Sequence, residues 1–280
     1  MYSETMDGAK LTDRDFRRFS ALVYDKCGIT LHEGKKALVC ARLGKRLRES
    51  GFRDFKAYYR FVVQGDRGDE LVRMLDAIST NLTSFFREES HFDFLKHRVF
   101  ADWTEGGGHQ KRIRIWSAGC SSGEEPYSVA ICLMEYFGDR LPADTKILGT
   151  DLSTKVLHQA QRGIYEAERV GKIPESMLRK YFQKGFGSQE GRFRVKRFIR
   201  DMIVFRRLNL MDPFFFKRPF NVIFCRNVMI YFDKEIQKIL VNKFYDSLVS
   251  DGYLFIGHSE SLTGISHRFR YIEPAVYHKP

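Results

Sequence analysis

The 280-residue sequence lacks the features of a secreted or membrane-spanning protein. Its longest apolar runs, at 220–225 and 228–232, are separated by an Arg-Asn pair and fall far short of the roughly 20 apolar residues that span a bilayer. Glu4 and Asp7 lie near the start with no apolar stretch behind them, which argues against a secretory signal. These absences predict a cytoplasmic protein without membrane insertion.

Cysteine is scarce and shows no ligand spacing. The five cysteines are scattered and odd in number, and none forms a C-x-x-C pair. Structural zinc sites need closely spaced Cys and His ligands, and disulfides belong to oxidising compartments. The sequence therefore predicts neither a metal site nor disulfides.

Phosphate-binding motifs are absent as well. The sequence has no G-x-G-x-x-G motif and no G-K-[ST] element, the patterns that arrange backbone N–H groups around phosphates. Positive charge, in contrast, is abundant: the formal net charge is +12. Such an excess favours encounter with nucleic acid, an anionic membrane or an acidic protein surface, and charge alone does not choose among them.

Helical periodicity dominates the first 80 residues. Thr12 and Asp15 form a capping-box pattern, after which apolar residues recur at helical spacing until Gly28. The same spacing predicts further helices at 35–49, 55–64 and 70–78. We therefore predict an all-helical N-terminal domain over residues 1–80.

From residue 112 onward, short apolar strands alternate with helices. This pattern is typical of βαβ units and a mostly parallel sheet, so the fold class is α/β. A glycine-rich stretch interrupts it and predicts a small antiparallel β-subdomain at about 181–202, inserted into a second domain over 81–280. The predicted strands are 112–116, 146–150, 202–205, 221–224 and 253–256, and the predicted helices are 125–137, 154–161 and 234–249.

Small residues between the first predicted strand and the next helix, at 116–125, indicate a close approach of the backbone to a ligand. Asp151 ends the following strand, where a carboxylate can accept the hydroxyl protons of a ribose; the same residue also suits a helix N-cap. Because no phosphate motif accompanies it, a nucleoside without phosphates, such as S-adenosylmethionine, fits better than a dinucleotide.

The same turn also matches G-x-S-x-G, the nucleophile elbow of α/β hydrolases, with Ser121 as the nucleophile. Asp251 and His258 follow in the chain order of a catalytic triad. Only one predicted strand precedes this motif, whereas a hydrolase elbow follows several. We therefore favour methyl transfer and keep the hydrolase as an alternative.

Four segments of the sequence together resemble one family, the protein-glutamate methyltransferases of chemotaxis receptors (the CheR family). The resemblance spans about the whole chain, in order, and four long segments in register make it specific. It implies a helical N-terminal domain before a Rossmann-like class I methyltransferase sheet with a small β-subdomain. The segments are 81–88 (NLTSFFRE), 121–128 (SSGEEPYS), 224–232 (FCRNVMIYF) and 257–260 (GHSE).

The resemblance also implies which residues surround the reacting end of the cofactor. Asn81, Thr83 and Arg87 would contact the methionine end of S-adenosylmethionine and the active site. Glu125 would bind the same region, and Tyr231 would face the transferred methyl group. Arg87 and Tyr231 are thus the candidate catalytic residues.

The nucleoside end has its own implied residues. Asp151 would hold the ribose, and Asn209 and Leu210 would flank the adenine. Arg226 and Asn227 would line the cofactor pocket. The implied reaction leaves S-adenosylhomocysteine and a glutamyl methyl ester.

A glutamate carboxylate is a suitable acceptor for this chemistry because it is already ionised at neutral pH, with a reference pKa of about 4.3. No general base is needed, in contrast to the methylation of amines or hydroxyls. We expect Arg87 and Tyr231 to orient the carboxylate by hydrogen bonds.

The positive charge has a candidate partner in this reaction. Lys35, Arg42 and Arg46 fall on one face of the second predicted helix. We expect this face to dock against the acidic, helical methylation region in the cytoplasmic domain of a receptor, although a solvated basic face is the simpler interpretation. In some family members the β-subdomain binds a C-terminal receptor peptide, which leaves that role open here, and we expect a monomer.

Two further alternatives remain. A nucleic-acid methyltransferase would also suit a basic protein, but the sequence has no D/N-P-P-Y element at the catalytic strand, so a nucleic-acid partner is not predicted. A cofactor-binding regulatory module without turnover is disfavoured by the presence of both Arg87 and Tyr231.

Overall fold

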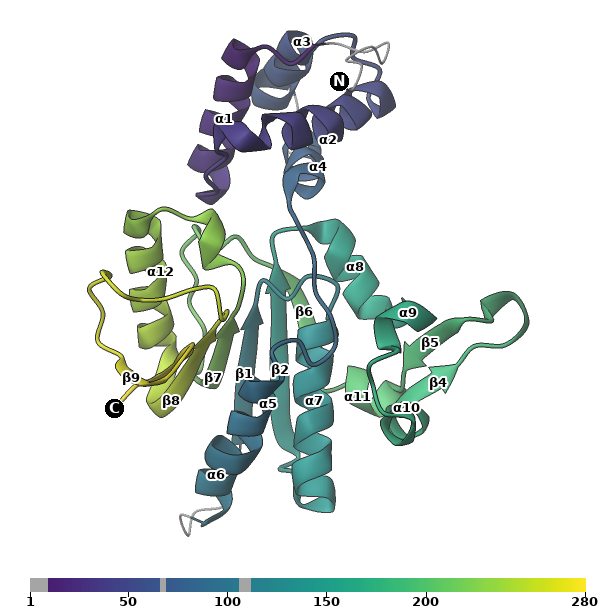
Figure 1. Cartoon of the computed structure of the whole chain (residues 1–280), viewed down its shortest axis with the longest axis vertical. Helices are drawn as coiled ribbons and strands as arrows, with labels where there is room; N and C mark the ends of the chain where they lie inside the picture. Colours follow the sequence, from purple (N-terminus) through teal and green to yellow (C-terminus); the bar gives the residue numbers. More distant parts are fainter. Residues whose placement is uncertain (1–9, 66–68, 106–111) are drawn as a thin grey trace.

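The structure, a computed structural model, describes residues 10–65, 69–105 and 112–280. A small helical unit lies over one end of a sheet domain, and a second, smaller sheet projects from the side of that domain (Figure 1). This arrangement confirms the predicted fold class. Across the described residues, none of the helices combines the length and the apolar character needed to cross a lipid bilayer.

The helical unit folds around an aromatic core. The Thr12 side chain caps its first helix by accepting a hydrogen bond from the Asp15 N–H, and Gly28 ends that helix in the left-handed conformation at φ 73°. The buried Phe19 ring contacts the Phe55 and Tyr58 rings, which joins the helices. The helices are α1 (Asp13–Cys27), α2 (Lys36–Glu49), α3 (Phe55–Arg60) and α4 (Asp69–Ile78).

The large sheet has seven strands in the order β6-β2-β1-β7-β8-β10-β9. The first five run parallel, and β10 and β9 add an antiparallel edge. The chain reverses its direction of winding between β1 and β7, where a doubly wound sheet opens its ligand crevice. The strands are β1 (Arg112–Ala118), β2 (Asp144–Asp151), β6 (Ile203–Arg207), β7 (Phe220–Cys225), β8 (Leu248–Ile256), β9 (Arg270–Glu273) and β10 (Val276–His278).

Helices cover both faces of this sheet because alternate residues of each strand point to opposite sides. On β1, Ile115 belongs to one buried cluster and Trp116 to the other. The helices of the first face are α5 (Glu89–Phe94), α6 (Ala101–Glu105) and α7 (Glu124–Phe137), α12 (Lys234–Ser247) covers the second, and α8 (Thr154–Arg162) follows β2.

The small sheet differs from its sequence-based prediction. It has three antiparallel strands, β3 (Ile164–Glu166), β5 (Arg192–Val195) and β4 (Phe182–Lys184), in the order β3-β5-β4. The predicted interval 181–202 leaves out β3, because a three-residue strand is too short to show the alternation of apolar and polar residues that predicts a strand. Two short helices, α9 (Ala167–Val170) and α10 (Glu175–Tyr181), lie between β3 and β4, and α11 (Arg197–Arg200) leads from β5 to strand β6 of the large sheet.

Candidate active site

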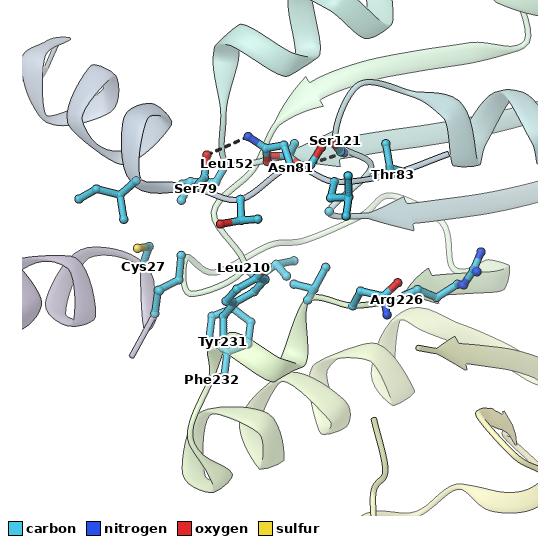
Figure 2. A pocket seen from close by; sticks show the side chains of 18 of the residues that line it. Cys27, Ser79, Asn81, Thr83, Ser121, Leu152, Leu210, Arg226, Tyr231 and Phe232 are labelled. Atoms are coloured by element: carbon cyan, nitrogen blue, oxygen red, sulfur yellow. Dashed lines mark hydrogen bonds between the residues drawn. The ribbon is translucent and has the colours of Figure 1, made fainter. Parts of the chain in front are cut away.

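A pocket lies between the helical unit and the carboxyl ends of strands β1, β2, β6 and β7 (Figure 2). The segment 79–83 after α4 crosses it and forms one wall. All the cofactor and catalytic residues implied by the resemblance line this pocket: Asn81, Thr83, Arg87, Glu125, Asp151, Asn209, Leu210, Arg226, Asn227 and Tyr231. Of the predicted docking residues, Lys35 and Arg42 also line it, and Arg46 faces a separate groove.

The turn after β1 brings its backbone against the pocket. Gly119 has φ 80°, and a Cβ atom there would lie 2.4 Å from Cγ2 of Val228, so only glycine fits. The Ser121 N–H donates to Oδ2 of Asp151 at 2.8 Å, and the Ser153 N–H donates to Oδ1 at 2.9 Å. The end of β2 and the turn after β1 are therefore fixed to each other through one carboxylate.

Asp151 retains the capacity to bind a diol. A carboxylate offers about four lone-pair positions, so the bonds from Ser121 and Ser153 do not use all of them. Burial raises the pKa of Asp151, and these two N–H donors act in the opposite direction. The N-cap interpretation is wrong, because Ser153 caps α8 by accepting from the Val156 N–H, and Asp151 accepts instead from the N–H of Ser153. The side chain of Asp151 does line the pocket, and its role at a ribose stays a prediction.

Arg226 is the centre of a buried ion-pair network. Its guanidinium donates to Oε2 of Glu88 at 3.0 Å from Nη2 and to Oε2 of Glu125 at 3.1 Å from Nη1, and it also donates to the backbone carbonyl of Arg87. Its side chain is 2% exposed. Burial alone would raise the pKa of Glu88, but the charge of Arg226 and the hydrogen bonds from Arg226, His258 and Asn227 together hold it below its usual value. The network joins the end of β7 to the segment 81–88 and to α7.

Glu88 is a residue of this site to which sequence reasoning gave no role. It also accepts a hydrogen bond from Nδ2 of Asn227 at 3.3 Å, so it orients two pocket side chains at once. It ends the first of the four resembling segments, and that position was the only signal in the sequence.

The two candidate catalytic residues lie on different walls. Arg87 donates from Nη1 to the Leu82 carbonyl at 2.9 Å, and no carboxylate of the described residues lies within ion-pair distance of its guanidinium. The ring of Tyr231 has the Lys35 ammonium 4.9 Å from its centroid. The Tyr231 carbonyl accepts a hydrogen bond from the Thr30 N–H at 2.8 Å, which ties this wall to the helical unit.

The part of the pocket that is predicted to bind adenine, lined by Asn209 and Leu210, also contacts the helical unit. Leu210 is buried, and Nδ2 of Asn209 donates to the carbonyl of Lys26, at the end of α1, over 2.7 Å. Cys27 belongs to the same wall of the pocket in Figure 2. Both domains therefore supply residues to one cavity.

The predicted basic face of α2 is directed partly inward. Arg42 donates to backbone carbonyls at the end of α4, including that of Ser79 at 3.0 Å. Arg46 forms a two-point ion pair with Glu70, with both N···O distances at 2.6 Å. Two of the three predicted docking cations thus make internal contacts of the helical unit.

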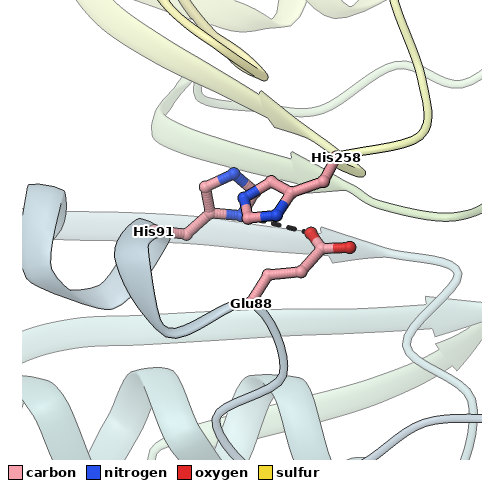
Figure 3. Close-up of side chains that lie close together, drawn as sticks. All are labelled: Glu88, His91 and His258. Atoms are coloured by element: carbon pink, nitrogen blue, oxygen red, sulfur yellow. Dashed lines mark ion pairs between the residues drawn. The ribbon is translucent and has the colours of Figure 1, made fainter.

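A cluster of possible metal ligands adjoins this site (Figure 3). Ligand atoms of Glu88, His91 and His258 lie within 4.8 Å of one another. Glu88, however, already accepts hydrogen bonds from Arg226 and Asn227, and the guanidinium of Arg226 opposes a second cation beside it. The cluster is better explained as part of the support of Arg226 than as a metal centre.

The hydrolase triad does not form. The Ser121 hydroxyl donates to the Asn81 carbonyl at 3.0 Å. His258 follows the carboxyl end of β8, where its Nε2 lies 3.2 Å from Oγ of Ser90, and Asp251 lies in the first half of the same strand. Serine, histidine and acid therefore cannot act together.

Comparison with known proteins agrees with this geometry. The family patterns described as "CheR methyltransferase, all-alpha domain" and "CheR methyltransferase, SAM binding domain" match residues 14–79 and 81–277. The "Chemotaxis protein methyltransferase" of Borreliella burgdorferi is 43% identical over 273 residues, covering 96% of this chain and 95% of that protein. That of Escherichia coli is 38% identical over 272 residues, covering 95% and 91%.

Proposed function

Because the chain belongs to the CheR methyltransferase family, we propose that its pocket directs the methyl group of S-adenosylmethionine to glutamate carboxylates of chemotaxis receptors. The family makes the chain an S-adenosylmethionine-dependent methyltransferase of chemotaxis. The observation that best supports a carboxylate as the methyl acceptor is the guanidinium of Arg87. It lines the pocket and has no carboxylate partner among the described residues.

The pocket side chains fit the cofactor. S-adenosylmethionine supplies a methyl group activated by a sulfonium. Asp151 would accept the ribose hydroxyl protons with its remaining lone pairs, and Asn209 and Leu210 would flank the adenine. Glu125 would bind the methionine end, because it lines the pocket. Burial raises the pKa of Glu125, and the guanidinium of Arg226 opposes that shift. Asn81 and Thr83 would contact the same end from the segment 79–83.

Arg87 and Tyr231 would position the acceptor without removing a proton. A carboxylate is ionised at neutral pH, so the barrier falls mainly through orientation and near-attack distance. Arg87 can contribute charge-assisted hydrogen bonds and Tyr231 a hydroxyl donor. Loss of all turnover in Tyr231→Phe, together with a new pKa near the working pH in the rate profile, would contradict this positioning role.

A label-transfer experiment tests the acceptor. The purified chain is incubated with methyl-labelled S-adenosylmethionine and a receptor cytoplasmic fragment, and alkali-labile label on the fragment is the expected product. Arg87→Ala should lower kcat/KM about 100-fold, because a charge-assisted contact to the acceptor is lost. Arg179→Ala, which removes an exposed ion pair with Glu175 within helix α10, is the matched control and should leave the rate unchanged.

Two other outcomes would overturn the proposal. Label on RNA or DNA would make the chain a nucleic-acid methyltransferase. Absence of label together with ester hydrolysis would restore the hydrolase alternative. Calorimetric titration with S-adenosylhomocysteine, wild type against Asp151→Ala, checks the cofactor separately, and the variant should bind at least about tenfold more weakly.

The chemotaxis relatives imply chemoreceptors as substrates. We propose the finer features of this partnership: a cytoplasmic monomer would dock on the acidic helical methylation region through Lys35, Arg42 and Arg46. Lys35 supports this proposal most directly, because its ammonium lies beside the Tyr231 ring at the pocket. Binding of a receptor C-terminal peptide to the small sheet remains a proposal of the same kind.

Charge reversal separates docking from folding. Lys35→Glu should raise KM for the receptor and reduce the dependence of kcat/KM on salt, because attraction to an acidic helix is lost. Arg46→Glu should instead lower the free energy of unfolding of the helical unit by roughly 3 kcal/mol, because it replaces the two-point guanidinium contact to the 6%-exposed Glu70 with a second carboxylate. Initial rates at several salt concentrations and urea unfolding measure the two effects. An unchanged receptor KM in Lys35→Glu would remove Lys35 from the docking surface.

A further inference from the structure

Two turns at the carboxyl ends of β7 and β8 lie against each other. The first, residues 226–231, carries Arg226, Asn227 and Tyr231 into the pocket. The second, residues 257–260, follows β8. A Cβ atom on Gly257 would lie 2.5 Å from Nδ2 and 2.8 Å from the backbone nitrogen of Asn227, so the approach is close enough to require glycine.

The carboxylate of Glu260 joins these turns. Its Oε2 accepts hydrogen bonds from the N–H groups of Asn227 at 2.9 Å and Gly257 at 2.6 Å. Its Oε1 accepts from the Ile230 N–H at 3.1 Å. One side chain therefore binds both the beginning and the end of the pocket turn.

The pocket turn needs such an acceptor. Asn227 has φ 58°, a left-handed conformation that is costly for a residue other than glycine and persists only where the surroundings fix it. The N–H groups of Asn227 and Ile230 lie between the end of β7 and α12, outside the sheet ladder. Burial raises the pKa of the Glu260 carboxyl, and the N–H donors oppose that shift. Hydrogen bonds to a charged acceptor are about twice as strong as neutral ones.

We propose that Glu260 is a positioning residue for methyl transfer, which fixes the turn 226–231 so that Tyr231 faces the acceptor. Glu260 does not line the pocket itself, so it acts through the backbone of this turn. The inference rests on the proposed function, since Tyr231 is the side chain through which its effect on turnover would be expressed.

The two-sided bonding predicts a specific effect of Glu260→Gln. The amide keeps the shape of the carboxyl group but has one oxygen acceptor. That oxygen serves best at the Asn227 and Gly257 N–H groups, which places the amide NH₂ against the Ile230 N–H. The Asn227 side of the turn is then retained, and the Tyr231 side is released. Because small misplacements of reacting groups are costly, kcat should fall about 10- to 100-fold while the KM for S-adenosylmethionine stays within about threefold.

The experiment compares wild type, Glu260→Gln and the exposed neighbour Ser259→Ala, using the full chain and a receptor cytoplasmic fragment. Turnover, cofactor KM, S-adenosylhomocysteine affinity and thermal midpoint are measured for each. The expected result is a loss in kcat alone for Glu260→Gln and no change for Ser259→Ala. Wild-type kcat in Glu260→Gln, or a parallel loss of kcat, ligand affinity and thermal midpoint, would overturn the positioning role.

Gly257→Ala provides a second variant if Glu260→Gln does not fold. The added methyl group would lie 2.8 Å from the backbone nitrogen of Asn227 and 2.9 Å from Oε2 of Glu260, so it disrupts the same contact between the two turns. A loss of kcat is expected, and wild-type kcat would contradict the inference. Failure of the proposed function is distinguishable, because wild type itself would then neither bind S-adenosylhomocysteine nor label the receptor fragment.

Discussion

His91 is a buried neutral base that packs on aromatic rings and lies beside charged groups, with its Nδ1 3.6 Å from Oε2 of Glu88. It is 1% exposed, its ring lies 5.3 Å from that of Phe255, and neither ring nitrogen has a hydrogen-bond partner among the described residues. Burial lowers the pKa of His91 to about 3. An unfolded histidine takes up a proton below about pH 6.5. Below that pH the unfolded state therefore binds more protons, and the stability of the fold declines as the pH falls toward 3.

Replacement by phenylalanine tests this single residue. His91→Phe keeps the aromatic contacts and removes the titrating group. The free energy of unfolding of the variant, relative to that of wild type, should therefore be about 2 kcal/mol more favourable at pH 5 than at pH 7.5. Urea unfolding at both pH values measures the gain, with the exposed His97→Gln as the control. An offset between His91→Phe and wild type that does not change with pH would mean that His91 does not titrate as a buried neutral base.

Single residues also show what a sequence reveals. The position of Asp151 at the pocket could be predicted because parallel strands expose their carboxyl ends at one edge of a sheet. The contacts of Arg46 could not, because helical spacing gives the face of a residue but not what packs on that face. Glu260 was missed for a related reason: its partners are backbone N–H groups, which every residue except proline has.

At the scale of elements, α9 links the small sheet to the pocket. Arg169 on this helix forms an ion pair with the fully buried Glu124 at 2.5 Å. It also donates to Oγ of Ser122 at 3.2 Å and to the carbonyl of Thr83 at 3.3 Å. Tyr165 on β3 donates to the Ser122 carbonyl at 2.7 Å. The small sheet thus supports two pocket segments, 81–88 and the turn after β1.

A double-mutant cycle measures this link. Arg169→Met leaves the Glu124 carboxylate buried without its cation and should destabilise the fold by roughly 3 kcal/mol. Adding Glu124→Gln should recover most of the loss, because the remaining group is neutral and still close to Ser122. Urea unfolding of the four proteins gives the coupling energy. Strictly additive losses would show that the two side chains do not act as a pair.

Elements differ in how well the sequence specifies them. The long strands and helices around the pocket were predictable because their apolar periodicity extends over several residues. Strands β3, β9 and β10 were not predicted, since three or four residues carry too little pattern and pair with partners distant in the chain.

At the scale of the molecule, contacts between the domains enclose the pocket from several sides. Asp76 on α4 accepts hydrogen bonds from the N–H and hydroxyl of Thr154 at the start of α8. Tyr24 on α1 donates to Asp233, the N-cap of α12, at 2.6 Å. The sequence indicated two domains but not their placement, because these contacts join residues far apart in the chain through side chains with no recognisable spacing.

The hydrogen bond between Asn209 and the Lys26 carbonyl has a kinetic consequence. The wall of the pocket proposed to contact adenine includes both Asn209 and the end of α1, so it is complete only while the helical unit packs against the sheet domain. If Asn209 flanks the adenine as proposed, release of S-adenosylhomocysteine would require this contact between the helical unit and the sheet domain to open, and a receptor docked on the helical unit would then influence the rate of product release.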